Sequence, residues 1–225
     1  MTGKRQFTGD IIYNRLMKKI IELEYGPEKT ISEEMLTNEF GVSRTPLRQA
    51  LYRLELEGLI VRQPNGRMHV APVSVQEAQE IFKVREVLEG LIAREATRNI
   101  TKEQLTRLED TLQLMLRAAR DHRNSDTVRY GSEFHHLLYE PCQNQTAIQF
   151  LSQLKMRLER YRRLGGYRNP KYAPMIPAQE HHDLFLAIKS GDADLAENRM
   201  RAHIRRSLDV AIDTLQLAVA DEKKD

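Results

Sequence analysis

The stretch Ile31–Val70, ISEEMLTNEFGVSRTPLRQALYRLELEGLIVRQPNGRMHV, decides the fold that this chain is expected to adopt. Apolar residues at helical spacing predict a short helix over Glu33–Phe40, and Gly41 then permits a sharp turn. A second helix is predicted to begin at once, with Ser43 as its cap, and to end before Gly58. Two helices joined by so short a turn are typical of a helix-turn-helix.

The residues that follow the second helix predict a β-hairpin. Two short runs, 59–64 and 67–70, flank the pair Asn65-Gly66. This pair is suited to a tight turn with positive φ angles. A hairpin directly after a helix-turn-helix is a wing, so the sequence predicts a winged helix-turn-helix.

The polar face of the second helix carries residues that suit contact with DNA. Arg44 and Arg48 are one turn apart and Thr45 lies at the helix start, so two guanidinium groups and a hydroxyl should point away from the core. Guanidinium groups bind guanine edges in the major groove or clamp phosphates. For two arginines alone, an ordinary solvated face explains the pattern equally well. The turn, the helix and the wing together favour DNA binding.

Composition limits the partners that the chain can have. The 225 residues carry a formal net charge of +3, so any affinity for DNA must come from a local basic patch. The expected patch comprises Arg44, Arg48, Arg53, Arg62, Arg67, Lys18 and Lys19. The single cysteine, Cys142, excludes an intramolecular disulfide and fits a reducing cytoplasm. We expect a cytoplasmic protein, because no apolar run approaches the roughly 20 residues that span a bilayer and the chain starts without an apolar secretion segment.

The chain beyond the hairpin predicts a second, all-helical domain. We expect a winged helix-turn-helix domain over residues 1–72 and a helical domain over residues 73–225. Apolar residues recur at helical spacing in about six segments of the second domain. A long loop is expected over Gly165–Pro177, because the pair Gly165-Gly166 should end a helix. The predicted fold class is mainly α, with a small β-hairpin wing and an antiparallel helical bundle.

Three of the seven histidines fall on apolar faces of predicted helices. His181 shares its face with Phe185, His203 shares its face with Met200, and His135 lies on a third helix. Each histidine by itself is more simply explained as a core residue with a hydrogen-bond partner. Three imidazoles in one small bundle leave several buried nitrogens seeking partners, and a divalent metal ion satisfies them together. The pattern therefore predicts a metal site.

Residues 40–67, FGVSRTPLRQALYRLELEGLIVRQPNGR, resemble the winged helix-turn-helix of the GntR family of bacterial transcription regulators, whose signature runs close to VSRTPVREALRRLEAEGLV. The resemblance implies DNA contacts at the positions of Ser43, Arg44, Thr45 and Arg48, and at the wing tip formed by Asn65 and Gly66. Some members add an arginine from the preceding helix. Glu34 holds that position here, so this contact is expected to be absent.

Three further segments resemble the FCD domain, the effector-binding domain of the FadR subfamily, and the six-helix, VanR-like type fits best. They are VREVLEGLIAREA (84–96), EFHHLL (133–138) and EHHDLFLAIKSGDADLAENRMRAHI (180–204). Metal-binding members use three histidines, which match His135, His181 and His203, and an aspartate, whose position is Gly131 here. Without that carboxylate we expect zinc or nickel rather than a harder ion such as manganese. Water or an effector carboxylate is expected at the open position.

The same resemblance implies that Arg85 reaches the cavity and holds an acidic effector. The plainer explanation is an exposed ion pair with Glu89 one turn further on, which contributes little. Arg157, Tyr161 and Arg162 in the long helix are further candidates for lining the cavity. The expected effector is a small organic acid held by the metal ion and arginine.

Together these features predict a transcription regulator, most simply a repressor and not an enzyme, that binds double-stranded operator DNA as a homodimer and responds to an effector. One alternative is a metal-dependent hydrolase or lyase built on the three histidines. Against it, nothing resembles HExxH, and no carboxylate lies at a spacing that suggests a general base. The other alternative is a regulator with a metal-free cavity that binds a long-chain acyl effector.

Overall fold

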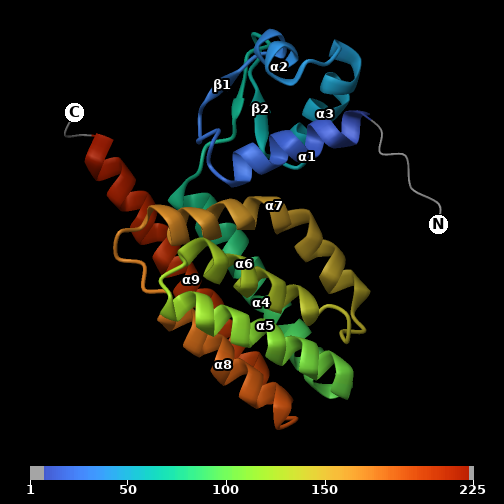
Figure 1. Ribbon diagram of the computed structural model, residues 1–225, viewed down its shortest axis with the longest axis vertical. Coiled ribbons are helices and arrows are strands. Elements are labelled where there is room, and N and C mark those ends of the chain that lie inside the picture. The colour runs from blue at the N-terminus through green and yellow to red at the C-terminus, as the bar shows by residue number, and fades with distance from the viewer. Residues whose placement is uncertain (1–7, 223–225) are drawn as a thin grey trace. The chain divides into compact units, whose positions relative to one another are not determined.

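The structure is a computed structural model that describes residues 8–222, with the side chains of residues 8–217 (Figure 1). The chain groups into two compact units. The first unit comprises the residues through Val73 together with Lys155–Arg160. The second unit comprises Ser74–Leu154 and the residues from Tyr161 onward.

The first unit is a winged helix-turn-helix, as the sequence predicts. Its elements are α1 (Thr8–Ile21), β1 (Thr30–Ile31), α2 (Glu33–Phe40), α3 (Arg44–Leu56), β2 (Ile60–Arg62) and β3 (Met68–Val70). The strands form an antiparallel sheet in the order β1-β3-β2. One apolar core joins the helices to the sheet, and its members include Ile12, Leu16, Ile20, Leu36, Leu47, Leu51, Leu54, Leu59 and Val70.

The turn between α2 and α3 follows from its residues. Gly41 adopts a left-handed conformation with φ 65° and donates its N–H to the Thr37 carbonyl, which ends α2. Ser43 lies at the N-cap position of α3, but its side chain makes no capping hydrogen bond, so the expectation that it caps the helix was wrong. The first amide groups of α3 therefore remain available to an anionic ligand such as a phosphate.

The wing turn differs from the expected one. Gly66 has a positive φ of 82° whereas Asn65 does not, so the expected turn with two positive φ angles was wrong. The Gly66 N–H instead donates to the Gln63 carbonyl at 2.8 Å, with Pro64 at the second position of the turn. Proline fixes φ at the value that this position needs, and glycine then supplies the left-handed residue that rejoins the strands.

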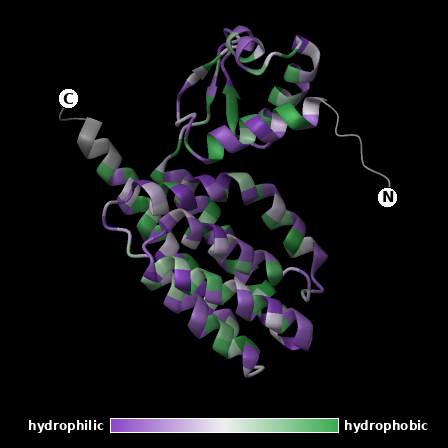
Figure 2. Cartoon of the chain, viewed as in Figure 1, coloured by the Kyte–Doolittle hydropathy of each residue, from purple (hydrophilic) through white to green (hydrophobic). Residues whose placement is uncertain are grey.

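The second unit is a bundle of helices, as predicted. The helices are α4 (Val75–Asn99), α5 (Lys102–Arg120), α6 (Asn124–Leu137), α7 (Gln145–Arg168), α8 (Met175–Lys189) and α9 (Ala193–Glu222). Helix α4 packs against α9, and α8 packs against both α5 and α9. Hydrophobic and hydrophilic residues are interspersed along these helices (Figure 2), as is expected of helices that bury one face. Within the described residues, no helix is both long and apolar enough to cross a membrane.

Helix α7 does not end at Gly165-Gly166, so the predicted long loop was wrong. The helix continues to Arg168, and α8 begins at Met175. A Cβ atom on Gly166 would lie 2.4 Å from Val128 Cγ2, and one on Gly165 would lie 3.1 Å from Val210 Cγ1. These glycines therefore allow α7 to pack closely against its neighbours, and they do not stop the helix.

We predict that Leu54→Ala lowers the free energy of unfolding of the first unit by about 2–5 kcal/mol, because the substitution leaves a cavity in the core. Leu54 is fully buried. Leu56→Ala is the matched control, because that side chain is 69% exposed on the same helix, and it should change stability little. Urea unfolding of both variants checks the prediction, and equal losses of stability would contradict it.

Candidate functional site

The outer face of α3 presents the polar residues that the sequence singles out. Ser43, Arg44, Thr45 and Arg48 are all exposed, while Leu47 and Leu51 of the same helix are buried. The Arg48 side chain is 64% exposed. The two arginines and the hydroxyl groups are therefore accessible to a large ligand, and the core does not use this face.

Arg48 makes an ion pair that the sequence analysis did not identify. Its Nε donates to both carboxylate oxygens of Glu33, at 2.9 and 3.0 Å. An exposed ion pair contributes roughly 0–1 kcal/mol, so a ligand that offers better acceptors can displace it. Glu33 thus orients Arg48 in the free protein without blocking its use.

The wing extends this polar surface. Asn65, Gly66 and Arg67 are exposed, and the Asn65 side chain accepts a hydrogen bond from the Arg67 N–H at 3.0 Å. An open pocket of about 470 Å³ lies beside the wing and the start of α2, and both Arg62 and Glu33 line it. Helix α3 and the wing are the two elements that a winged helix-turn-helix presents to duplex DNA.

The second unit brings His135, His181 and His203 together from α6, α8 and α9. The ring centroids of His181 and His203 are 4.4 Å apart, and that of His135 lies 5.1 and 5.3 Å from them. All three rings are buried, and one ligand atom from each lies within 4.8 Å of the others. A zinc ion at about 2.1 Å from each nitrogen in a tetrahedral arrangement sets the ligand atoms roughly 3.4 Å apart, so the rings must move inward to close the cluster around an ion.

Each histidine is oriented through its Nδ1 atom. His135 Nδ1 lies 3.0 Å from a Glu89 carboxylate oxygen, His181 Nδ1 lies 2.7 Å from the Pro177 carbonyl oxygen, and His203 Nδ1 lies 2.7 Å from a Glu180 carboxylate oxygen. A carbonyl can only accept, so His181 carries its proton on Nδ1. With Nδ1 hydrogen-bonded in each ring, the lone pair of Nε2 is left for a ligand. Among the described residues, Nε2 of His135 and Nε2 of His181 are buried without a hydrogen-bond partner.

The surroundings keep these rings neutral. Burial lowers the pKa of His135 well below its usual value, and the guanidinium groups of Arg85 and Arg162 lower it further. Burial likewise lowers the pKa of His181, to which the His203 imidazole adds, and the pKa of His203, to which the His135 imidazole adds. At His181 this lowering of the pKa outweighs the attraction of the Glu180 carboxylate. Neutral imidazole is the form that binds metal ions.

A cavity of about 60 Å³ adjoins the cluster. Its lining includes Tyr161, Arg162, His181, His203 and Arg206. Tyr161, one of the expected lining residues, also holds the start of α4, since its hydroxyl accepts a hydrogen bond from the Ser74 N–H at 3.0 Å. Two expected effector contacts, Arg85 and Arg157, are not among the lining residues, and Arg157 belongs to the first unit.

Arg85 does pair with Glu89, as the plainer explanation held, but the pair is buried and not exposed. Its Nε donates to a Glu89 carboxylate oxygen at 3.2 Å, and the two side chains are 2% and 3% exposed. The other Glu89 oxygen contacts His135. Arg85 thus supports the histidine cluster through Glu89.

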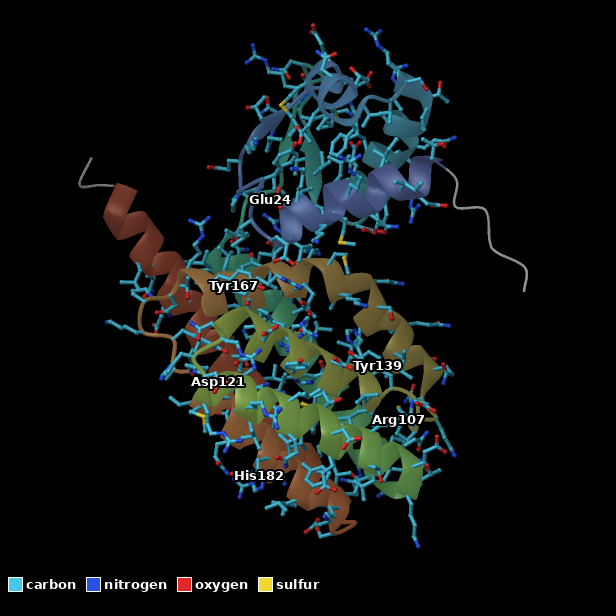
Figure 3. The ribbon with its side chains drawn as sticks, viewed as in Figure 1. Glu24, Arg107, Asp121, Tyr139, Tyr167 and His182 are labelled. Carbon is cyan, nitrogen blue, oxygen red and sulfur yellow. The ribbon has the colours of Figure 1, made fainter. Side chains whose placement is uncertain are left out.

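Glu180 and Arg206 contribute to the cluster but were not predicted from the sequence. Glu180 precedes His181 by one residue and bonds to both His203 and Arg206. The three-residue spacing between His203 and Arg206 was the available signal, because it places them on one helix face. His136 and His182, the residues that directly follow His135 and His181 in the sequence, are not members of the cluster. Figure 3 shows one of them, His182, at the surface of α8, where its side chain is 36% exposed.

Comparisons with known proteins agree with both units. Residues 8–70 match the family model described as bacterial regulatory proteins, gntR family, and residues 80–206 match the FCD domain. The chain belongs to the GntR family and carries its FCD domain. The resemblance seen in the sequence is thereby confirmed, and the protein is a transcriptional regulator of that family.

Relatives and solved structures match nearly the whole regulator. The HTH-type transcriptional repressor RspR of Escherichia coli K12 is 28% identical over 86% of this chain and 84% of its own. The gluconate operon transcriptional repressor of Bacillus licheniformis is 27% identical over 85% of this chain and 79% of its own. The E. coli McbR/YncC structure shares the fold with a TM-score of 0.79, at 19% identity, over 93% of this chain and 99% of that one.

We predict that the metal-free regulator loses stability as the pH falls below the usual histidine pKa of 6.5. The folded rings resist protonation while the unfolded rings accept protons, so acid favours the unfolded state. His203→Gln removes one such group. For each pH unit below 6.5, the free energy of unfolding of this variant should therefore fall by roughly 1 kcal/mol less than that of the wild type. Urea unfolding at several pH values measures this. His182→Gln is the exposed control and should behave like the wild type, and a His203→Gln variant with an unchanged pH dependence would contradict the account.

Proposed function

We propose that this regulator represses transcription by binding operator DNA through α3 and the wing. The observation that carries the proposal is the exposed face formed by Ser43, Arg44, Thr45 and Arg48, which the core leaves open. Guanidinium groups at the start of a recognition helix suit both guanine edges and phosphates. Asn65, Gly66 and Arg67 would then contact the neighbouring groove. A regulator that binds operator DNA would work in the bacterial cytoplasm, where the DNA is.

We further propose that the second unit holds a divalent metal ion, zinc or nickel, through Nε2 of His135, His181 and His203. Support comes from the buried Nε2 atoms and from the acceptors that occupy each Nδ1. Neutral nitrogen donors favour these two ions over manganese. The ion would supply a Lewis-acidic point at which an effector oxygen binds.

The proposed effector is a small organic acid, with Arg162 and Tyr161 in the cavity that receives it. A cavity of about 60 Å³ is too small for a long acyl chain, which speaks against the metal-free, acyl-responsive alternative. Two copies of the regulator would bind a palindromic operator, since paired recognition helices double the contact set. Effector binding would change operator affinity by favouring one arrangement of those helices.

A metal-dependent hydrolase or lyase is the competing function. Glu89 and Glu180 are the carboxylates at the cluster, and both are bonded to histidine Nδ1 and to an arginine. Those bonds suit a positioning role better than that of a general base. Turnover of a metabolite by a protein that does not bind promoter DNA would favour the enzyme.

We predict that Arg44→Ala and Arg48→Ala each weaken operator binding about 5- to 150-fold, because each removes a charge-assisted contact worth about 1–3 kcal/mol. Fluorescence anisotropy with DNA from the promoter of the regulator's own gene measures the affinity, and wild-type binding should weaken steeply with added salt. Arg120→Ala, an exposed arginine on α5, is the control and should bind like the wild type. Retained affinity in the Arg44→Ala/Arg48→Ala double variant would contradict the proposed interface.

We predict that regulator purified without added metal or chelator contains zinc or nickel, and that His181→Ala/His203→Ala contains neither. Two of the three nitrogen donors are removed in that variant, so the remaining imidazole cannot hold the ion. Elemental analysis by mass spectrometry measures the content. His136→Ala/His182→Ala is the matched control, because it changes the adjacent histidines and should keep the metal. An equal and negligible metal content in all three proteins would contradict the proposed metal site.

A further inference from the structure

Glu33 contacts the recognition helix from a position beside the wing. It lies in the first turn of α2, and its two carboxylate oxygens accept from Arg48 Nε on α3 at 2.9 and 3.0 Å. It also lines the open pocket of about 470 Å³ together with Arg62 and Arg67 of the wing. The Glu33 side chain is 24% exposed, whereas that of Arg48 is 64% exposed. Glu33 is therefore the fixed partner, and Arg48 is the partner that projects into solvent.

Arg48 offers a ligand only part of its guanidinium. Its Nε is occupied by Glu33, and among the described residues no group accepts from Nη1 or Nη2. Those two nitrogens form the end of the planar guanidinium and carry four of its five N–H donors. A guanine presents two acceptors, O6 and N7, at its major-groove edge, so this end can bind both while Glu33 keeps Nε. The guanine contact therefore adds to the ion pair and does not replace it.

A phosphate gains less from the same side chain. If a phosphate takes Nε from Glu33, the exchange is easy, but one anion replaces another and no contact is added. If a phosphate binds the end of the guanidinium, it brings a full negative charge close to the Glu33 carboxylate, whereas a guanine edge carries only partial charges. Like charges brought together in an interface cost free energy. The ion pair should therefore weaken binding to the DNA backbone more than binding to a guanine.

Most other cations of the expected basic patch are also paired. The further ion pairs are Arg53–Asp10 at 2.6 Å, Arg62–Glu55 at 3.3 Å and Lys19–Glu24 at 2.8 Å. Within the described part of the chain, Arg44 and Arg67 are the arginines of the patch without an ion-pair partner. Pairing reduces the attraction of a surface for any polyanion. The first unit is therefore built for modest general affinity for DNA, and the acidic partners are part of that design.

This inference rests on the proposed DNA interface. We propose that Glu33 is a specificity-determining residue, which holds Arg48 by Nε so that the end of its guanidinium contacts a guanine of the operator, and which repels the phosphates of other DNA. Its role is a positioning one, exercised through Arg48. Specificity is a difference between two affinities, and Glu33 increases it by lowering the affinity for the wrong sequences.

Two duplexes measure this discrimination. The first is selected by the wild-type regulator from a library of randomised duplexes, and the second is a scrambled sequence of the same length and base composition. Fluorescence anisotropy gives the affinity for each duplex, and the ratio of the two affinities is the discrimination. Glu33→Gln should bind the scrambled duplex more tightly than the wild type does, and its discrimination should fall at least about fivefold. Unchanged discrimination in this variant would overturn the proposal.

Glu34→Gln is the matched control. Glu34 follows Glu33 in the first turn of α2, it is exposed, and among the described residues its carboxylate has no partner. The substitution removes the same charge from the same end of the helix, so it should tighten binding to both duplexes equally and leave the discrimination unchanged. An equal loss of discrimination in Glu34→Gln and Glu33→Gln would overturn the proposal, because net charge alone would then explain the effect. An exposed ion pair contributes little to stability, so both variants should unfold in urea like the wild type.

Salt dependence and a double variant test whether Glu33 acts through Arg48. Once released from Glu33, Arg48 can bind a phosphate. A plot of log affinity for the scrambled duplex against log salt concentration should therefore be steeper by about 1 in Glu33→Gln. In an Arg48→Ala background, Glu33→Gln should cause neither the steeper slope nor a further loss of discrimination. A full effect of Glu33→Gln in that background would overturn the positioning role.

Failure of the proposed DNA interface would give a different result. A wild-type regulator that enriches no sequence from the library and binds both duplexes equally would overturn the interface on α3 and the wing, and this inference with it. A wild type that discriminates, together with a Glu33→Gln variant that discriminates equally well, would overturn the role of Glu33 and leave the interface in place.

Discussion

The centre of the second unit depends on three hydrogen bonds made by the Nδ1 atoms of buried imidazoles. Glu89, the Pro177 carbonyl and Glu180 each fix one ring, and burial keeps the rings neutral. Burying a polar atom without a partner costs free energy, so nitrogen lone pairs that face one another in a core need a shared ligand. Arg85 and Arg206 hold the two glutamates in turn, which extends the ordered shell to α4 and α9.

The first unit follows the opposite rule, because its functional groups are left in solvent. A formal net charge of +3 gives the whole chain little general attraction for DNA. Affinity for DNA must therefore come from the positions of the arginines. Leu47, Leu51 and Leu54 hold one side of α3 against the core, and this leaves its other side to Arg44 and Arg48. Glu33 keeps Arg48 ordered at small cost, since an exposed ion pair is readily exchanged for a phosphate.

Periodicity and turn chemistry predicted most of the fold, because the spacing of apolar residues in an amphipathic helix indicates which face is buried. The bounds of α2, the six helices of the second unit and the inward faces of the three histidines were all predicted correctly. The errors arose where a contact between residues far apart in the sequence determines the local structure. Gly165 and Gly166 stay helical because Val210 and Val128 pack against them, and local sequence cannot show that. The positions of Glu180 and Arg206 beside the cluster likewise depend on how the helices pack.

The account joins two kinds of chemistry in one regulator, and its central claim is that the histidine cluster controls the affinity of α3 and the wing for DNA. Thermodynamic linkage requires that a ligand which changes operator affinity is itself bound differently by the DNA-bound protein. The most direct measurement is operator affinity of the wild type and of His181→Ala/His203→Ala, each titrated with and without Zn²⁺ and acetate. The account predicts that the ligands change the affinity of the wild type several-fold and leave the variant unchanged. Identical responses of the two proteins, or no response in either, would contradict it.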